Sequence, residues 1–499
     1  MAEASAEAAA KVLMRMRTNM AIRTASSISR RGYIASRSAA AAASFASSAC
    51  LIRRRRHHGQ LPLHRMGFIR YMNIQSSAQA EGKNYNYNLG ELSDASSLKV
   101  QLTPNGFKWP ESVDHAADTA FLELIVKHTP KDMACPSISA KSSQKEDVTH
   151  HFFDKNASGR RYLDLSQLLS LDPGDEVELS SDTGTAWETN EHAWLTTFSN
   201  PSIEDKRVLV LSPHPDDAEI AAYGLYSSSN SRIVTITAGD AGKPKFGRLW
   251  DDAGEQYRAK GRIRTIDSLT VPLLAGLGPE AIRNLGYYDG TLAEMHSSPF
   301  ESVEPKYAEL ENPGYFRSFN FDRELRDRAF EPSWSNLVAD ICIELDTFRP
   351  DIVVMPHPWL DSHRDHKFTT VAAVSALARW NQHCTIYLYT NHATGSEMYP
   401  FGPRDGMMGL PPWADGQVRQ CHYINGLCSR PLSKESQRQK LVALEAHHDL
   451  RPFNLFDGSE VIEPPPGLDY YRRGGRPNEL FFVADYAGAW GMCQQLLGN

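Results

Sequence analysis

The most constraining feature of the sequence is a run of apolar residues, Val208–Leu211, that ends abruptly in charged side chains. The stretch reads VLVLSPHPDDAEIAAYGL over residues 208–225. Four apolar residues without alternation are typical of a short strand buried on both faces. Apolar residues then return at helical spacing, so the charged residues lie where a buried strand passes into a helix. In open α/β sheets this is where ligand crevices form.

The same strand-then-helix pattern recurs along the C-terminal part of the chain. Buried-type strands are expected at RIVTITAG (232–239), DIVVMPHPW (351–359) and TIYLYT (385–390), with a strand or loop at LGYYDGTL (285–292). Helical spacing occupies much of 254–274, 333–348 and 361–380. This alternation predicts an α/β domain over 205–499, a Rossmann-like, mostly parallel sheet with helices on both faces. Neither G-x-G-x-x-G nor G-x-x-x-x-G-K-[ST] occurs, so the glycines that cradle phosphates in dinucleotide and P-loop sites are missing.

The segment before this domain has a different character. Strand-like stretches at 121–128, 160–169, 175–181 and 194–199 are separated by turn signals such as DPGD and DTGT. We therefore predict a small β-sandwich over 95–200, followed by a polar linker at 200–207. Trp109, Trp187 and Trp194 could stack on sugar rings, but a place in a core or an interface is the favoured alternative.

The first 90 residues are predicted to be a disordered basic leader. Residues 1–80 hold 13 Lys and Arg against two Glu, and they are rich in Ala and Ser. Such a composition resembles an organellar transit peptide. An extension upstream of the true start, with Met66 or Met72 as that start, is an equally weighted alternative. The protein is expected to be cytoplasmic, or organellar if the leader is a transit peptide.

Composition excludes several classes of protein. After residue 80, 58 Asp and Glu outnumber 40 Lys and Arg, which argues against a surface built for nucleic acid. The seven cysteines are scattered without a C-x-x-C pair, so neither a disulfide framework nor a thiolate zinc site is indicated. The apolar run 39–52 is too short to span a membrane, and no transmembrane helix is expected. Peripheral contact with a membrane stays possible.

Two clusters of titratable residues follow two of the predicted strands. His214, Asp216 and Asp217 follow one strand, and the second cluster, His363, Asp365 and His366, follows another. If the two strands are neighbours, both clusters open onto one crevice. Two imidazoles and a carboxylate suit a catalytic zinc site with one position open to water. A single His-x-x-His is more often a surface pair, but two clusters at buried strand ends favour a site.

These two motifs resemble those of the LmbE-like, or PIG-L, family of zinc-dependent de-N-acetylases. The family pattern is H-P-D-D-x-E with a later H-x-D-H, and the chain has PHPDDAE and HRDH. The similarity extends over about 205–485. Weaker echoes are the Arg264-x-x-Asp267 helix, where Glu is usual at the second position, LGYYDG (285–290) and LVALEAHHDL (441–450). Asp361 stands where some members have a tyrosine that binds the substrate carbonyl.

The resemblance implies a role for each residue of the two motifs. His214, Asp217 and His366 would bind zinc, although Fe²⁺ suits the same ligands. Asp216 would be the general base that takes a proton from the attacking water. His363, as imidazolium, would stabilise the oxyanion and could pass a proton to the leaving amine, with Asp365 orienting it. Glu219 would hold the aspartate loop or favour the helix start.

The implied reaction is hydrolysis of an N-acetyl group on an acetamido sugar, such as an N-acetylglucosaminyl glycolipid or glycan, with release of acetate. The β-sandwich favours a larger glycan or a surface glycolipid over a small conjugate. Two alternatives stay open. One is an amidase acting on another amide, such as a sugar–thiol conjugate, and the other is a glycan-binding protein with a relic site.

Overall fold

The structure is a computed structural model. It describes residues 84–129, 135–142, 144, 148–155, 157–189, 192–394, 396, 398–412, 423–451 and 470–498. The described residues belong to one compact unit that spans 65–499. Most of the predicted leader, residues 1–83, lies outside the described residues.

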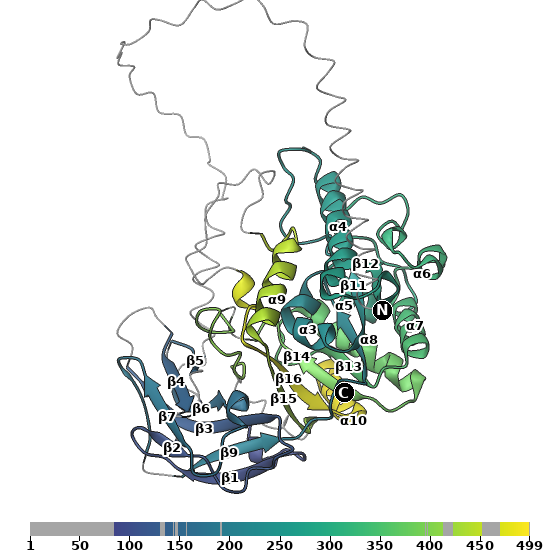
Figure 1. The fold of residues 1–499 in the computed structure, drawn as a ribbon. Coiled ribbons are helices and arrows are strands. Elements are labelled where there is room, and N and C mark those ends of the chain that lie inside the picture. Colours follow the sequence, from purple (N-terminus) through teal and green to yellow (C-terminus); the bar gives the residue numbers. More distant parts are fainter. Residues whose placement is uncertain are drawn as a thin grey trace, which may run out of the picture. The chain divides into compact units, whose positions relative to one another are not determined.

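A seven-stranded sheet forms the centre of the C-terminal part (Figure 1). Its order is β12 (Ile282–Tyr287), β11 (Asn230–Thr237), β10 (Arg207–Ser212), β13 (Ile352–Pro356), β14 (Thr385–Tyr389), β16 (Asn478–Ala484) and β15 (Gly426–Pro431). The first five strands pair in parallel, and the β14–β16 and β16–β15 pairs are antiparallel. Residues 208–211 of β10 are all fully buried, which explains why this strand reads as an unbroken apolar run. The mixed α/β architecture expected from the sequence is confirmed.

Helices cover both faces of this sheet. The α-helices are α3 (Asp217–Ser227), α4 (Ala253–Thr270), α5 (Leu292–Ser297), α6 (Arg323–Asp327), α7 (Trp334–Phe348), α8 (Arg364–Trp380), α9 (Lys434–Ala446) and α10 (Tyr486–Leu497). Short 3₁₀ turns are η1 (Leu89–Glu91), η2 (Ser166–Leu168), η3 (Val271–Ala275), η4 (Pro279–Ala281), η5 (Arg317–Phe319) and η7 (Tyr470–Arg472). One hydrophobic cluster joins the sheet to α5, α7, α8 and α10, and a second joins it to α3 and α9.

The helix expected over 333–348 shows how local sequence sets these boundaries. Ser333 caps the start of α7 by accepting a hydrogen bond from the Asn336 N–H, as a serine N-cap commonly does. Arg349 ends the helix in the left-handed region with φ 52°, and Pro350 follows, which cannot continue a helix.

The segment that precedes the α/β part consists of two antiparallel sheets. One sheet contains β1 (Ser96–Gln101), β9 (His192–Phe198), β3 (Thr119–His128), β6 (Ser158–Asp164) and β8 (Thr185–Trp187). The other contains β2 (Gly106–Lys108), β7 (Glu176–Ser181), β4 (Ser137–Ser142) and β5 (Val148–Phe152). Side chains from both sheets share one hydrophobic cluster. We call residues 96–198 the two-sheet region; the predicted domain boundaries stay a prediction.

The three tryptophans proposed as sugar platforms lie in different environments. Trp109 is buried in the core of the two-sheet region, and Trp187 packs against that core. Trp194 is the exposed one of these three: 41% of it is exposed, and the Lys99 ammonium group lies over its ring. Trp109 is therefore a core residue, which is the alternative to sugar stacking that the sequence favoured.

The predicted disorder of residues 84–90, the last part of the leader, is wrong. Tyr85, Tyr87 and Leu89 are buried in the same hydrophobic cluster as the central sheet. The Tyr87 hydroxyl donates to the Pro411 carbonyl at 2.7 Å. These apolar residues alternate with asparagines, so one side of an extended segment is buried while the other faces water.

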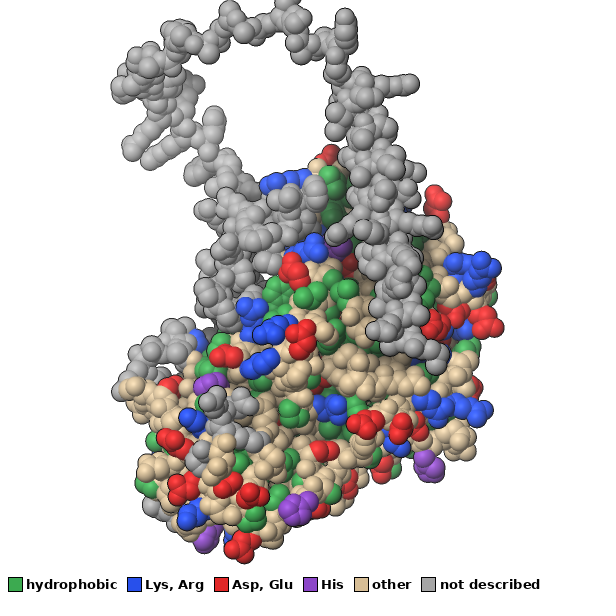
Figure 2. All heavy atoms as spheres, in the orientation of Figure 1, with side chains coloured by type: hydrophobic (Ala, Val, Ile, Leu, Met, Phe, Trp, Pro, Cys, Tyr) green, Lys and Arg blue, Asp and Glu red, His purple; other side chains and the backbone are tan. Residues whose placement is uncertain are grey.

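Acidic and basic side chains are interspersed on the described part of the surface seen in Figure 2. Among the described residues, no helix combines the length and hydropathy that crossing a bilayer requires.

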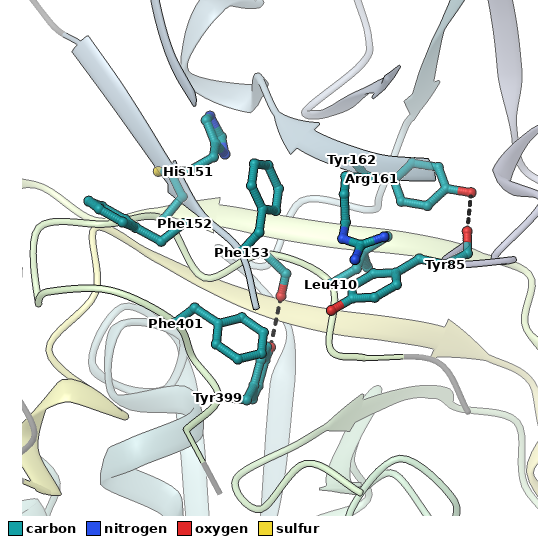
Figure 3. A pocket seen from close by; sticks show the side chains of 11 residues that line it. Tyr85, His151, Phe152, Phe153, Arg161, Tyr162, Tyr399, Phe401 and Leu410 are labelled. Carbon is teal, nitrogen blue, oxygen red and sulfur yellow. Dashed lines mark hydrogen bonds between the residues drawn. The ribbon is translucent and has the colours of Figure 1, made fainter. Parts of the chain in front are cut away.

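A small cavity lies between the two-sheet region and the loop that follows β14. Aromatic rings line the cavity; Figure 3 shows Tyr85 and Tyr162 beside the Arg161 guanidinium, and Tyr399 and Phe401 together on another part of the lining. The cavity volume is about 10 Å³, which is enough for about one water molecule. A sugar ring therefore does not fit, and the cavity is part of the packing between these segments.

Candidate active site

The sheet order brings the two predicted clusters together. β10 and β13 are adjacent and parallel, with Val208 opposite Ile352 and Val210 opposite Val354. Their carboxyl ends therefore lie at one edge of the sheet, where the PHPDD and HRDH segments meet. His214, Asp216, Asp217, Asp365 and His366 are all buried, and His363 is half-buried. The condition stated for the sequence, that the two strands are neighbours, is therefore met, and the two clusters lie together.

Three ligand-type atoms form a nearly equilateral triangle. Asp217 Oδ2 lies 3.1 Å from His214 Nδ1 and 3.1 Å from His366 Nε2. The two imidazole nitrogens are 3.3 Å apart. Donors held about 2.0–2.1 Å from a tetrahedral ion lie roughly 3.3 Å from one another, so the triangle has the size that a zinc site requires.

Both of these imidazoles have a carboxylate on their far side. His366 Nδ1 lies 3.0 Å from Asp361 Oδ2. His214 Nε2 lies 3.2 Å from Asp289 and 3.4 Å from Asp365. A carboxylate behind a histidine ligand fixes its tautomer and orientation, and it raises the basicity of the ligand.

The electrostatics of the two imidazoles reflect these neighbours. Burial opposes a charge on His366, but Asp217 and Asp361 outweigh burial and raise its pKa to about 10. Burial likewise opposes a charge on His214, but Asp289 and Asp217 raise its pKa well above the usual value. The neighbouring carboxylates therefore favour positive charge at His214 and His366.

Asp361 connects three segments around the site. Its Oδ2 also accepts hydrogen bonds from the N–H groups of Asn391 (2.9 Å) and His392 (3.1 Å), after β14. Its Oδ1 accepts from the His363 N–H at 2.9 Å. The sequence marked Asp361 only as a departure from a tyrosine. The sequence did contain a signal for a role of Asp361 in the site, because this residue stands between the end of one predicted strand and the start of a helix.

Asp216 lies beside the triangle in an unusual backbone conformation. Its φ is 110°, which non-glycine residues rarely adopt and which is found where function requires it. Its Oδ1 accepts a hydrogen bond from Arg264 Nη2 at 3.2 Å, and the same nitrogen donates to the Pro215 carbonyl at 2.8 Å. Burial raises the pKa of Asp216 to about 7, against the lowering effect of Arg264.

His363 and Asp365 both lie in the cluster, but among the described contacts no hydrogen bond joins the carboxylate to the imidazole that it was expected to orient. The His363 ring contacts those of His214 and His366, with centroids 4.7 and 4.9 Å away. Asp365 Oδ2 accepts instead from the Gly290 N–H and lies near His214. Burial, together with His214 and His366, lowers the pKa of His363 to about 4. In this arrangement His363 is a neutral imidazole, and its buried Nδ1 has no partner among the described residues.

Glu219 does not cap the start of α3. Its carboxylate lies 3.0 Å from His447 Nε2 and accepts a hydrogen bond from the Tyr226 hydroxyl at 2.9 Å. The next residues along the chain pair in the same way. His448 contacts Asp267 at 2.8 Å, and Asp449 lies 3.5 Å from Arg264. The HHD segment after α9 therefore braces α3 and α4 from the side of Asp216.

Further acidic and polar residues come from the ends of strands that the sequence did not assign to the site. Asp289 follows β12, and Asn391 and His392 follow β14. Asn391 Nδ2 donates to Asp217 Oδ1 at 2.8 Å, which leaves Oδ2 directed at the two imidazoles. Within the described chain, several sets of these His and Asp side chains could hold a metal ion.

The comparison with known proteins agrees with a site at the two motifs. Residues 209–377 match the family model PIG-L, described as GlcNAc-PI de-N-acetylase, and that range contains both motifs. No curated protein matches the chain. The match supports a de-N-acetylase, which is a hydrolase.

Solved structures similar to this chain include two of a deacetylase from teicoplanin biosynthesis. A triple mutant of that enzyme, Orf2, is 16% identical, covers 56% of this chain and 98% of its own, and gives a TM-score of 0.32. Its complex with teicoplanin is 17% identical with the same coverage and a TM-score of 0.30. GalB, the 4-carboxy-2-hydroxymuconate hydratase from Pseudomonas putida KT2440, is 12% identical, covers 56% of this chain and 95% of its own, and gives a TM-score of 0.25. On the family match, residues 209–377 of the chain form a PIG-L (LmbE-like) domain.

Proposed function

We propose that the protein is a zinc-dependent N-deacetylase that hydrolyses the acetamide group of an amino sugar. The reaction adds water across the amide C–N bond and yields a free amine and acetate. The observation that carries this proposal is the triangle formed by His214 Nδ1, Asp217 Oδ2 and His366 Nε2, with Asp216 next to it in the chain.

His214, Asp217 and His366 would hold the metal ion. Two imidazoles and one carboxylate are a donor set that suits Zn²⁺, and Fe²⁺ is the alternative. A bound Zn²⁺ would supply Lewis acidity at the substrate carbonyl and would lower the pKa of water.

Asp216 would take the proton of the attacking water. Its hydrogen bond from Arg264 fixes one carboxylate oxygen, so the side chain has a defined orientation. A base whose pKa is raised toward neutrality by burial is well matched to proton transfer near neutral pH.

His363 would donate a hydrogen bond to the oxyanion of the tetrahedral intermediate. A neutral imidazole retains one N–H donor, so this role does not require the imidazolium form, and the ring could pass a proton to the leaving amine. Asp365 would act mainly through His214 and the Gly290 backbone, because these are the groups that its carboxylate contacts.

The substrate class proposed is an N-acetylglucosaminyl glycolipid or glycan. The family description names GlcNAc-PI, which supports an N-acetylglucosamine unit as the group that is deacetylated.

The test is the Asp216→Asn variant in the full chain loaded with Zn²⁺. Acetate release is measured over N-acetylglucosaminyl lipids, oligosaccharides and inositol conjugates. Loss of a general base is expected to lower turnover by about 10²–10⁴-fold, while the metal content stays near that of the wild type. The matched control is Asp267→Asn, which removes a buried carboxylate of α4 that pairs with His448 rather than with the metal triangle.

Retained turnover in Asp216→Asn would rule out this base. If the zinc-loaded wild-type protein binds glycans and releases no acetate from any member of the panel, it is a glycan-binding protein with a relic site. Release of another acid from a thiol conjugate would identify a different amidase.

A further inference from the structure

His392 lies among the residues of the candidate site, and the catalytic roles assigned above leave it unused. It comes from the loop after β14. The centroid of its ring lies 5.3 Å from that of His366 and 5.6 Å from that of His363. One of its ring nitrogens lies within 4.8 Å of ligand-type atoms of Asp217 and His366. The residue is only partly buried, so a substrate oxygen beside the metal triangle can reach its imidazole.

The backbone of His392 is fixed against the loop after β13. Its N–H donates to Asp361 Oδ2 at 3.1 Å, and its carbonyl accepts from the Ser362 N–H at 2.7 Å. Asp361 and Ala393 also form an antiparallel bridge. The same Asp361 carboxylate accepts from the His363 N–H at 2.9 Å. One carboxylate therefore sets the backbone positions of both His392 and His363.

Arg473 fixes the orientation of the His392 ring. Its guanidinium is buried, and Nη1 donates to the Asn391 carbonyl and, at 3.4 Å, to His392 Nδ1. An arginine side chain can only donate hydrogen bonds, so Nδ1 is the acceptor. In the neutral ring the proton therefore lies on Nε2, and His392 has an N–H donor at that nitrogen.

This tautomer decides between two roles for His392. A histidine that binds a metal must offer the ion a lone pair. The lone pair of Nδ1 already accepts from Arg473, and Nε2 carries the proton, so neither nitrogen is available to a cation. An N–H group can instead donate to an oxygen on which negative charge develops, and the guanidinium behind the ring adds positive charge nearby.

We propose that His392 is a second hydrogen-bond donor to the oxyanion, beside His363, and that Arg473 is the residue that positions it. The inference rests on the proposed deacetylase function and adds a residue to its mechanism. Oxyanions in acyl-transfer sites are stabilised by several preorganised donors, and two imidazoles on neighbouring loops supply such a set. No proton leaves His392 in this role.

The first test compares acetate release by the zinc-loaded full chain and by His392→Ala, on the panel member that the wild type hydrolyses fastest. Loss of one oxyanion donor should lower kcat about 10²–10³-fold. KM should change little, because the hydrogen bond strengthens only in the transition state. His392→Gln keeps an N–H donor and should recover part of the loss. The matched control is His383→Gln, an exposed histidine before β14, and its kcat should match that of the wild type.

Two binding measurements do not depend on turnover. In competition with a coloured chelator, His392→Ala should retain the zinc affinity of the wild type, which also shows that its metal site is folded. The methylphosphonamidate of glucosamine mimics the tetrahedral intermediate. Calorimetry should show it binding to zinc-loaded His392→Ala about tenfold or more weakly than to the wild type, as expected for loss of a hydrogen bond to a charged oxygen.

Arg473 is tested with a double-mutant cycle. Arg473→Ala should lower kcat in the wild-type chain and have little further effect in His392→Ala, because Arg473 acts through His392. Equal losses in the two backgrounds would overturn the positioning role and leave Arg473 as a support for the loop through the Asn391 carbonyl.

Wild-type kcat and analogue affinity in His392→Ala would overturn the inference and leave the deacetylase function standing. A loss of zinc affinity in His392→Ala would overturn it in favour of a metal ligand. Absence of acetate release by the wild type would instead contradict the proposed function, and the inference would fall with it.

Discussion

Two buried charged clusters pack against the same sheet and differ in how their charges are balanced. In the first, Asp340 of α7 accepts hydrogen bonds from Arg317, from Arg328 at 2.8 Å and from the Tyr287 hydroxyl at 2.8 Å. Arg317 also donates to the Leu285 carbonyl at 2.8 Å. One carboxylate lies between the buried Arg317 and the partly exposed Arg328, so the protein itself neutralises Asp340 and the cluster has no excess of negative charge.

The other charged cluster is the candidate active site, at the carboxyl ends of the parallel strands, and it is rich in carboxylates. Six aspartates lie there, namely Asp216, Asp217, Asp240, Asp289, Asp361 and Asp365. Arg264 is hydrogen-bonded to Asp216, whereas Asp217, Asp289 and Asp361 have histidines as their close partners. A balanced buried cluster can serve structure alone. A buried cluster with an excess of carboxylates, together with imidazoles, is suited to bind a cation.

The largest effect on stability should come from breaking the balanced cluster. Asp340→Ala leaves Arg317 buried without its carboxylate, so the free energy of unfolding should fall by about 3–5 kcal/mol. Urea denaturation measures this change. A loss below about 1 kcal/mol would show that the first cluster is not held together by its charges.

The site cluster should respond to metal rather than to mutation alone. Zn²⁺ at about 100 times its Kd should raise the free energy of unfolding by about 2.7 kcal/mol. Asp217→Asn should remove most of this increment, because it removes the carboxylate shared by both imidazoles. Urea denaturation with and without a chelator gives the increment. Asp340→Ala should retain the zinc-dependent increment in unfolding free energy. If Asp340→Ala lost this increment, or Asp217→Asn kept it, the two clusters would not differ in their need for a cation.

The sequence predicted the elements that form the site because their signals are local. The VLVL run is buried on both faces as β10, and His363 and His366 fall at the start of α8 as their spacing indicated. The six residues of the two motifs were brought together because β10 and β13 are parallel neighbours. That adjacency was an assumption at the level of sequence, and the register of the sheet confirms it.

Contacts between distant segments could not be predicted in this way. The pairing of Glu219 with His447 joins residues 228 positions apart, and no local pattern encodes it. The carboxylate of Asp365, expected to orient His363, instead accepts a hydrogen bond from the Gly290 N–H after β12, a contact between segments 75 residues apart. The burial of Tyr85 and Tyr87 depends on tertiary packing in the same way, because a short polar-flanked segment has little local signal.

A smaller effect is expected from the carboxylate behind one ligand. Asp361→Asn keeps the shape of the side chain but weakens its interaction with His366 Nδ1, so zinc affinity should fall about 10–100-fold. Competition with a coloured chelator measures this affinity. Asp267→Asn is the control, and its affinity should match that of the wild type. Unchanged affinity in Asp361→Asn, with activity lost, would assign Asp361 a role other than orienting His366.

The smallest effect concerns His447, which balances Glu219 beside the site. Burial opposes a charge on His447, but Glu219 and Asp216 outweigh burial and raise its pKa. A raised folded-state pKa stabilises the protein fully below the unfolded value of about 6.5, and this stability is lost as pH rises through the folded-state value. His447→Gln should therefore flatten the decline of unfolding free energy above neutral pH, by about 1.4 kcal/mol per unit of pKa difference. Urea denaturation across pH tests it, with the more exposed His448→Gln as control. Because Glu219 and His447 compensate each other, the flattening should be the same with chelator or with Zn²⁺, which would place this pair with the Asp340 cluster rather than with the metal triangle.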